Sequence, residues 1–205
     1  MPRETEIKIR ISDASAIRRQ LRKLGFQIHV RRTFESNVIL DTPVRRLGRK
    51  GAMIRIRRVG GKSILTYKGR SKDGRHKSRE EIETHLEDPT ALETIFARLG
   101  LKLVFQYEKY RAEYERPGQH GVVTVDETPV GDYIEIEGSP RWIDTVAGDL
   151  GFAKRDYITE SYGAIYVQYC RDHGIKPTQM IFGSKAHAKR KGHGRTPETK
   201  KAKLP

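Results

Sequence analysis

The sequence predicts an α+β fold, in which eight mostly antiparallel strands close into a β-barrel and helices pack outside it. Eight segments have the two-residue period of strands, and seven strand-like segments carry a charged face. Hydrophobic residues make up only 36% of the chain and charged residues 33%, so the core is lean. A closed barrel would gather the charged faces into a tunnel and turn the apolar faces toward the helices.

The first strand, over residues 4–11, shows this alternation most clearly. Glu4, Glu6 and Lys8 share one face, and Ile7 and Ile9 share the other, because side chains two apart on a strand point the same way. The remaining strands are predicted at residues 34–41, 53–59, 63–68, 78–86, 103–115, 122–127 and 133–137.

Three helices are predicted from one repeated set of signals. Each acidic strand is followed by a Ser or Asp cap, an amphipathic stretch and a Leu-Gly stop, which places helix ends at Leu24, Leu99 and Leu150. A fourth helix is predicted over residues 159–172. Its tyrosines are assigned to helix packing, and they are Tyr162, Tyr166 and Tyr169.

The chain is divided into a domain over residues 1–174 and a basic tail over residues 175–205. The tail has nine Lys and Arg residues, one acidic residue and no hydrophobic periodicity from Lys176 onward, so it is predicted to be disordered. The formal net charge of the whole chain is +15, which favours a polyanionic partner, and the tail is expected to attract polyanions weakly. The polar segment at residues 69–77 is predicted to be a mobile basic loop.

A single cysteine, Cys170, excludes an internal disulfide and is consistent with a cytoplasmic protein. The chain shows no signal peptide and no apolar run long enough to cross a membrane, so no membrane partner is expected. A homodimer is left open.

Glu-x-Glu pairs recur on three of the predicted strands. Two carboxylates that point at one place repel each other, and they stay ionised only beside a positive group, usually a hard cation such as Mg2+ or Mn2+. Other strands supply Lys and Arg, and a pocket of this composition suits a polyphosphate bridged by a divalent metal. The pairs are Glu4/Glu6, Glu81/Glu83 and Glu135/Glu137, and the basic residues are Arg55, Arg57, Lys68, Lys109 and Arg111.

Each of these features also has a simpler interpretation. An alternating charged face is usually a solvated face. Asp126 alone could be a turn residue, and Glu81 and Glu83 could be solvated charges at the tunnel mouth. The seven His residues show no metal-binding spacing.

Six charged motifs, taken in order from residue 2 to about residue 170, resemble the CYTH family of triphosphate tunnel metalloenzymes. This family takes in class IV adenylyl cyclases, thiamine triphosphatases and inorganic triphosphatases. The motifs are Glu-x-Glu-x-Lys at residues 4–8, Arg-Ile-Arg at 55–57, Lys68, Arg-Glu-Glu-x-Glu at 79–83, Lys-x-Arg at 109–111 and the acidic block from Asp126 to Glu137. The basic tail is not part of the family pattern.

The resemblance implies a tunnel that binds a triphosphate together with Mg2+ or Mn2+. The implied metal ligands are Glu4, Glu6, Glu135 and Glu137, with Asp126 and Glu83 or Glu81 in support. The implied triphosphate-binding residues are Lys8, Arg55, Arg57, Lys68, Lys109 and Arg111, with Arg79 as a weaker candidate. The residues expected to contribute to catalysis are Lys8, Arg57, Lys109 and Arg111.

The resemblance is greatest to the class IV adenylyl cyclase branch, which implies conversion of ATP to cyclic AMP and pyrophosphate. A triphosphatase that hydrolyses thiamine triphosphate, inorganic triphosphate (tripolyphosphate) or a nucleoside triphosphate is the alternative, because both reactions need the same grip on phosphate. A non-catalytic binder of polyphosphate or RNA is a second alternative, which the basic tail favours and the carboxylate pairs oppose. No residue stands out as a general base.

Overall fold

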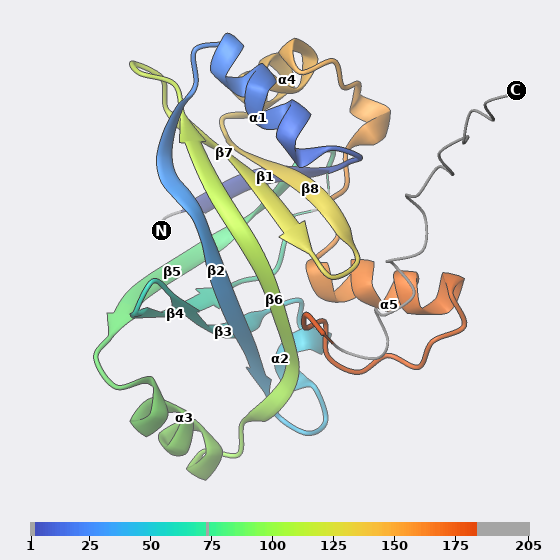
Figure 1. Cartoon of the computed structure of the whole chain (residues 1–205). Helices are drawn as coiled ribbons and strands as arrows, with labels where there is room; N and C mark the ends of the chain where they lie inside the picture. Colours follow the sequence, from blue (N-terminus) through green and yellow to red (C-terminus); the bar gives the residue numbers. More distant parts are fainter. Residues whose placement is uncertain (1–2, 73, 184–205) are drawn as a thin grey trace, which may run out of the picture.

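The computed structural model describes residues 3–72 and 74–183, which form a closed barrel of antiparallel strands in the order β1-β5-β4-β3-β2-β6-β7-β8 (Figure 1). The predicted fold class is therefore confirmed. The strands are β1 (Arg3–Ile11), β2 (Gln27–Asp41), β3 (Met53–Val59), β4 (Lys62–Lys68), β5 (Lys77–Leu86), β6 (Lys102–Glu115), β7 (Gly121–Thr128) and β8 (Gly131–Gly138). The helices are α1 (Ala14–Lys23), α2 (Arg46–Arg49), α3 (Pro89–Arg98), α4 (Pro140–Asp149), α5 (Tyr162–Asp172) and a 3-10 turn (Lys154–Asp156).

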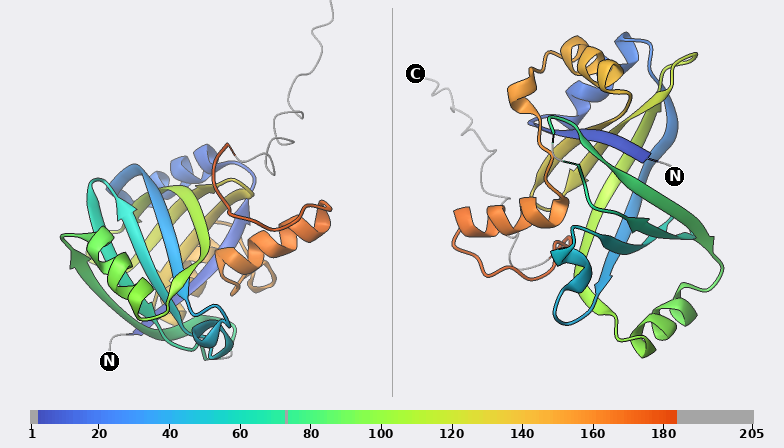
Figure 2. Two further views of the ribbon diagram at one scale, coloured as in Figure 1. Left: turned by 90° about the horizontal axis from the view of Figure 1, so that it is seen from below. Right: turned by 180° about the vertical axis from the view of Figure 1, so that it is seen from behind.

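The barrel is apolar outside and charged inside, as the alternation predicts. On β1, Ile7 and Ile9 are at most 1% exposed, and they belong to a core shared with α1 and α4. These two helices lie over β1, β7 and β8, whereas α3 lies at the opposite end of the barrel and α5 at its side (Figure 2). The inward faces of the strands are thereby left to the charged residues.

Pairing of the first and last strands closes the barrel and sets the charged residues against one another. In the register of β1 with β8, Glu6 lies opposite Glu137 and Lys8 lies opposite Glu135. On the other side of β1, Glu4 lies opposite Arg79 of β5. Residues far apart in the sequence therefore face the same short stretch of tunnel.

Three helices begin at the predicted caps. The Oδ1 atom of Asp13 accepts hydrogen bonds from the first turn of α1 at 2.7 and 3.0 Å, and Asp88 caps α3 in the same way. Ser139 caps α4. Gly25 follows α1 with φ of +83°, a conformation that glycine adopts without strain.

Two parts of the fold differ from the prediction. Strand β2 begins at Gln27 and not at residue 34, because residues 27–33 pair with β6 through register shifts while both of their faces stay largely exposed, so no alternation marks them. The short helix α2 was not predicted. It is held by Asp41, whose carboxylate accepts hydrogen bonds from the backbone N–H groups of Leu47 at 3.0 Å and Gly48 at 2.9 Å.

The first part of the predicted tail is packed on the barrel. Strand β7 pairs with β6 only from Tyr110 onward, which leaves the preceding edge of β6 without a neighbouring strand. Met180 takes this place: its N–H donates to the Gln106 carbonyl at 3.0 Å, its carbonyl accepts from the Glu108 N–H at 2.9 Å, and its side chain is fully buried. The prediction that disorder starts at Lys176 was therefore wrong for residues 176–183, and residues 184–205 lie outside the described part of the chain.

We expect the packed segment to stabilise the domain measurably. Full burial of a methionine side chain contributes about 1.5–3 kcal/mol, so ending the chain at Ile175 should lower the thermal midpoint by about 3–12 °C. A chain that ends at Gly183 keeps Met180 and serves as the control. Equal midpoints for the two shortened chains, measured by calorimetry, would show that the segment adds nothing to stability.

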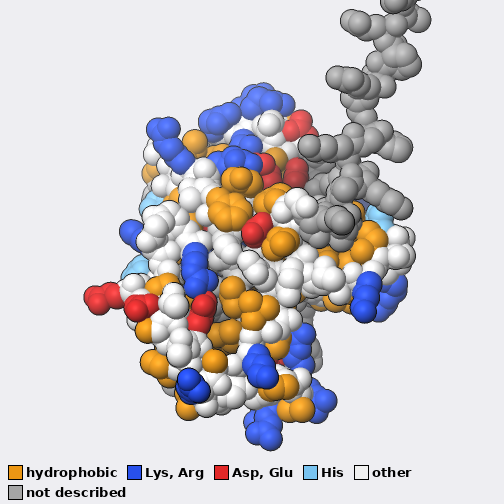
Figure 3. Space-filling view, turned by 60° about the horizontal axis from the view of Figure 1, so that its bottom comes forward, with side chains coloured by type: hydrophobic (Ala, Val, Ile, Leu, Met, Phe, Trp, Pro, Cys, Tyr) orange, Lys and Arg blue, Asp and Glu red, His pale blue; other side chains and the backbone are white. Residues whose placement is uncertain are grey.

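The outer surface mixes charged and apolar side chains. On the face shown in Figure 3, Lys and Arg side chains gather along the upper edge and around the bottom, with hydrophobic side chains between them. Within residues 3–72 and 74–183, no helix is long and apolar enough to cross a membrane.

Candidate functional site

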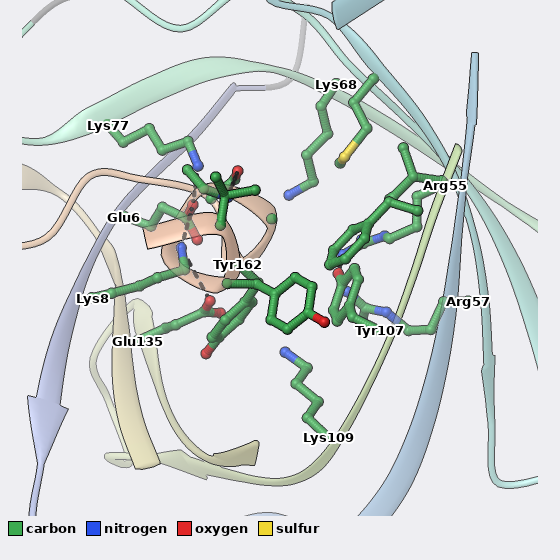
Figure 4. Close-up of a pocket in the computed structure, with 18 of the residues that line it drawn as sticks. Glu6, Lys8, Arg55, Arg57, Lys68, Lys77, Tyr107, Lys109, Glu135 and Tyr162 are labelled. Carbon is green, nitrogen blue, oxygen red and sulfur yellow. Dashed lines mark hydrogen bonds and ion pairs between the residues drawn. The ribbon is translucent and has the colours of Figure 1, made fainter. Parts of the chain in front are cut away.

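A cavity of about 1030 Å³ lies inside the barrel, and side chains from all eight strands and from α5 line it (Figure 4). It brings together every predicted site residue except Asp126. The predicted residues that line it are Glu4, Glu6, Lys8, Arg55, Arg57, Lys68, Arg79, Glu81, Glu83, Lys109, Arg111, Glu135 and Glu137.

Lys8 is held between two carboxylates. Its Nζ atom lies 3.1 Å from Glu6 Oε1 and 3.1 Å from Glu135 Oε1, an arrangement visible in Figure 4. Burial acts to lower the pKa of Lys8, but Glu135 and Glu6 outweigh it, so the pKa is raised and the ammonium group stays charged. Lys8 is therefore a permanent cation at the wall of the cavity.

Glu4 and Glu81 meet beside Lys68. The Lys68 Nζ atom lies 2.6 Å from Glu4 Oε2 and 2.9 Å from Glu81 Oε1, and Arg79 Nε lies 2.6 Å from Glu4 Oε1. Burial and the hydrogen bond with Glu4 raise the pKa of Glu81 to about 8. Glu4 is also penalised by burial, but the hydrogen bond from Glu81, with Lys68 and Arg79, holds its pKa low. At neutral pH this pair of side chains shares a proton.

Glu137 adds a further acidic group, which forms no ion pair with a Lys or Arg side chain of residues 3–72 and 74–183. Its pKa is raised to about 7, first by burial and then by the charges of Glu4 and Glu6. The wall formed by β1, β5 and the end of β8 therefore holds more carboxyl groups than its Lys and Arg side chains neutralise. Such a set of oxygen donors fits a hard cation such as Mg2+ or Mn2+.

The carboxyl groups do not form a ready-made cage. In the part of the chain that the structure describes, no three Asp, Glu, His or Cys side chains converge closely enough to hold a metal by themselves. Glu4 and Glu6 are instead engaged by Lys and Arg side chains. A cation would have to compete with these ion pairs for the same oxygens.

Arg55 and Arg57 face the cavity from β3 with hydrogen-bonding capacity to spare. Arg55 Nη2 donates to Thr66 Oγ1 at 3.1 Å and to Glu83 Oε1 at 3.2 Å. The Nε atoms of both arginines are buried and have no hydrogen-bond partner among the described residues. Buried donors without acceptors are costly, so these groups are suited to binding an anion.

Asp126 does not line the cavity, although it was predicted as a supporting metal ligand. It is fully buried, and its Oδ2 atom accepts hydrogen bonds from Lys109 at 2.9 Å, Arg111 at 2.6 Å and Tyr162 at 2.6 Å. Its Oδ1 atom accepts from Arg111 Nε at 2.7 Å. Both oxygens are thus used to hold the two cations of β6 in place, a positioning role that strand parity alone did not reveal.

Lys77 also lines the cavity, although it was not predicted as a site residue. This residue begins β5, and its Nζ atom lies 3.2 Å from Glu6 Oε1. Burial and the charge of Lys8 lower the pKa of Lys77 to about 8. Residues 69–77 were predicted to be a loop, so Lys77 was not placed on a strand. Its two-residue spacing from Arg79 and Glu81 would have indicated that it shares their face.

Tyr162 and Glu35 were also missed. Tyr162 was assigned to helix packing, which it does together with Tyr166, but its ring also lies 5.5 Å from Lys8 Nζ and 5.2 Å from Lys109 Nζ. Glu35 lies 3.8 Å from Arg57 and 3.6 Å from Lys109. Burial opposes its ionisation, but Lys109 and the arginines lower its pKa to about 2. A lone glutamate in a strand without a Glu-x-Glu pair carries no distinctive signal.

Solved structures share this architecture. A Pyrococcus horikoshii protein superimposes with a TM-score of 0.68 and 26% identity, over 80% of this chain and 98% of that one. A Hippeastrum protein, assigned provisionally as an adenylyl cyclase and described as having a dominant triphosphatase activity, gives a TM-score of 0.58 and 20% identity, over 85% of this chain and 97% of that one. Because the Hippeastrum protein is only 20% identical, its similarity to this chain shows a shared fold and nothing more.

Sequence comparison gives the closer relationship. A Methanocaldococcus jannaschii protein, named provisionally as an adenylate cyclase, is 33% identical over 136 residues, which are 66% of this chain and 77% of that protein. The family model described as the CYTH domain matches residues 2–150, the region that forms the barrel and its carboxylate wall. The chain therefore belongs to the CYTH domain family.

Proposed function

We propose that the protein is a metal-dependent enzyme that acts on a triphosphate, and that its reaction is the conversion of ATP to cyclic AMP and pyrophosphate. The observation that supports this most strongly is one cavity that combines a wall of incompletely neutralised carboxyl groups with buried Arg and Lys donors. A binder of polyanions alone would gain nothing from carboxylates that face its ligand. The provisional name of the Methanocaldococcus jannaschii relative favours the cyclase reaction.

In this proposal the cations of the cavity hold the phosphate oxygens. Arginine can grip phosphate with two parallel hydrogen bonds, whereas lysine acts as a compact charge. The side chains that serve this role are Lys8, Arg55, Arg57, Lys68, Arg79, Lys109 and Arg111. Asp126 keeps two of them aligned through the contacts described above.

The carboxylate wall would hold Mg2+ or Mn2+. The ligands would be Glu4, Glu6, Glu135 and Glu137, with Glu81 and Glu83 in support. A bound divalent cation neutralises charge that develops on the phosphate oxygens of the leaving group.

The reaction depends on how the triphosphate lies along the cavity. In a cyclase the ribose 3′-hydroxyl attacks the α-phosphorus of ATP, loses its proton, and pyrophosphate leaves. In a triphosphatase water attacks the terminal phosphorus, and the remaining diphosphate leaves. The Hippeastrum structure, with its described triphosphatase activity, makes hydrolysis the second candidate.

Product analysis separates the two reactions. Purified protein would be incubated with ATP, thiamine triphosphate or tripolyphosphate, each with Mg2+ and with Mn2+. Cyclic AMP and pyrophosphate from ATP support the cyclase, whereas ADP and phosphate support the triphosphatase. Binding that survives EDTA and weakens steeply with salt, without turnover, would favour the non-catalytic binder.

Replacing Arg57 with Ala should lower the affinity for every triphosphate ligand, whatever its organic group. Loss of a charged hydrogen bond costs about 1.5–3 kcal/mol, so we expect affinity to fall about tenfold or more. Competition assays measure this directly, with Arg58→Ala as a neighbouring control because Arg58 pairs with Glu93 outside the cavity. Tripolyphosphate should compete with ATP in the unaltered protein, and AMP should not. Equal competition by AMP would contradict a site that recognises the phosphate chain.

Affinity for the cation should rise with pH. Glu137, with its pKa raised to about 7, and Glu81, with its pKa raised to about 8, hold protons at pH 6 that a bound cation must displace. Each proton that the cation displaces makes the affinity for Mn2+ increase by up to about tenfold per pH unit below the pKa of that group, with a plateau above it. Titration calorimetry between pH 6 and pH 8, in buffers of different ionisation enthalpy, would measure both the affinity and the released protons. An affinity independent of pH would exclude these two groups.

A further inference from the structure

The cavity has a second half in which apolar and aromatic side chains predominate, although polar residues such as Arg45, Gln168 and Arg171 also line the cavity on the side of α5. It is formed where the end of β2, the start of β3 and the first half of β6 approach α5. The apolar side chains that line it are Ile39, Met53, Val104, Phe105, Tyr107, Tyr166 and Val167. A triphosphate chain has no apolar surface to place there, so this half has no role in the phosphate grip described above.

The apolar half adjoins the phosphate-binding cations. In the strand registers Ile39 pairs with Arg55, and Met53 pairs with Lys68. Arg55 Nη1 also lies 3.5 Å from the hydroxyl of Tyr107. A group attached to a phosphate held by Arg55 and Lys68 would therefore reach the apolar side chains directly. Figure 4 shows Tyr107 on the same side of the cavity as Arg55 and Arg57.

The aromatic side chains of this half form a supported wall. The ring of Phe105 stacks on Tyr107 at 5.9 Å between centroids and on Tyr166 at 5.8 Å. Tyr107 and Tyr166 are buried, whereas Phe105 is half-buried and borders the cavity. Val167 faces the same space from α5 and is 45% exposed. Rings fixed by stacking present a rigid face that suits a planar ligand.

The size of the cavity agrees with a larger ligand than a bare phosphate chain. Sites for drug-sized organic ligands measure about 300–1,000 Å³, and this cavity reaches about 1030 Å³. Such sites combine an apolar lining with a few polar groups that fix orientation, which is the combination found here.

We propose that this apolar half binds the organic group of the substrate, a planar heteroaromatic ring system such as a nucleobase or a thiazolium, and that the protein prefers organic triphosphates to tripolyphosphate. The inference rests on the proposed function, because it assumes that the charged half binds the triphosphate. It adds the residues that select the substrate class: Phe105 and Val167 provide the contact surface, and Met53 and Ile39 join it to the cations.

Two variants test this subsite from different elements. Val167→Trp fills the apolar half without changing charge, and Phe105→Ala removes the half-buried ring that borders it. Ile95→Trp is the matched control, because Ile95 is 54% exposed on α3 and does not line the cavity. Affinities for α,β-methylene ATP and for tripolyphosphate, both with Mg2+, would be measured by calorimetry, and the thermal midpoint would identify a variant that fails to fold.

We expect both variants to lower the affinity for the ATP analogue about tenfold or more, the scale of a lost stacking contact. The affinity for tripolyphosphate should change by less than about twofold. An equal loss of affinity for both ligands, or no change in either affinity, would overturn the subsite while leaving the triphosphate site in place. Equal affinities of the two ligands for the unaltered protein would overturn the stated preference. Failure of the unaltered protein to bind either ligand would overturn the subsite and the proposed function together.

Discussion

Replacing Glu6 with Gln should lower turnover by at least about 100-fold, the scale for loss of a strong electrostatic contact in an active site. Glu6 is 5% exposed and lies between Lys8 and Lys77, opposite Glu137. Gln keeps the size of the side chain but removes the charge that would attract a divalent cation. The affinity for Mn2+, followed by electron paramagnetic resonance, should fall together with turnover.

The folded state should survive this substitution, because Lys8 keeps its ion pair with Glu135, and Lys77, whose pKa burial and Lys8 already lower to about 8, can lose its proton. A cooperative thermal transition would confirm this. Glu87→Gln makes the same chemical change on an exposed side chain that does not line the cavity, and it should leave both metal affinity and turnover unchanged. Turnover close to that of the unaltered protein at saturating metal would remove Glu6 from the proposed ligand set.

The alternation of charged and apolar residues predicted most of the barrel, because it is a local property of each strand. It also predicted which face is buried in the tunnel: Glu4, Glu6 and Lys8 point inward while Ile7 and Ile9 pack under helices. Closure of the barrel followed from the number of charged faces. Strand β2 was predicted too short because its first residues are exposed on both faces and carry no such pattern.

The parts of the site that were missed depend on contacts between distant segments. Lys77 was assigned to a loop although it shares parity with Arg79, and Tyr162 is indistinguishable by sequence from a packing tyrosine. The packing of Met180 on β6 could not be predicted either, because it requires knowing that β7 leaves the edge of β6 uncovered before Tyr110. A local pattern identifies a face, whereas a gap in a sheet exists only in three dimensions.

The contacts of Asp126 also join distant segments, and we expect its substitution to destabilise the fold strongly. Replacing Asp126 with Asn keeps the shape of the side chain but removes the charge that pairs with Lys109 and Arg111. Breaking a buried ion pair from one side costs about 3–5 kcal/mol, because the two buried cations lose the carboxylate they share and keep only Glu35 beside Lys109 and Glu135 beside Arg111. We expect the thermal midpoint to fall by about 6–20 °C.

Metal binding separates this positioning role from the predicted ligand role. Because both oxygens of Asp126 already accept hydrogen bonds from Lys109, Arg111 and Tyr162, the affinity for Mn2+ should change by less than about twofold in Asp126→Asn. Asp88→Asn is the matched control, since asparagine caps a helix as well as aspartate does and the midpoint should stay unchanged. A variant that loses Mn2+ binding but keeps its midpoint would show that Asp126 leaves its cations to bind the metal. A lowered midpoint with unchanged metal affinity places Asp126 behind the site, where it holds the two cations of β6 toward the substrate.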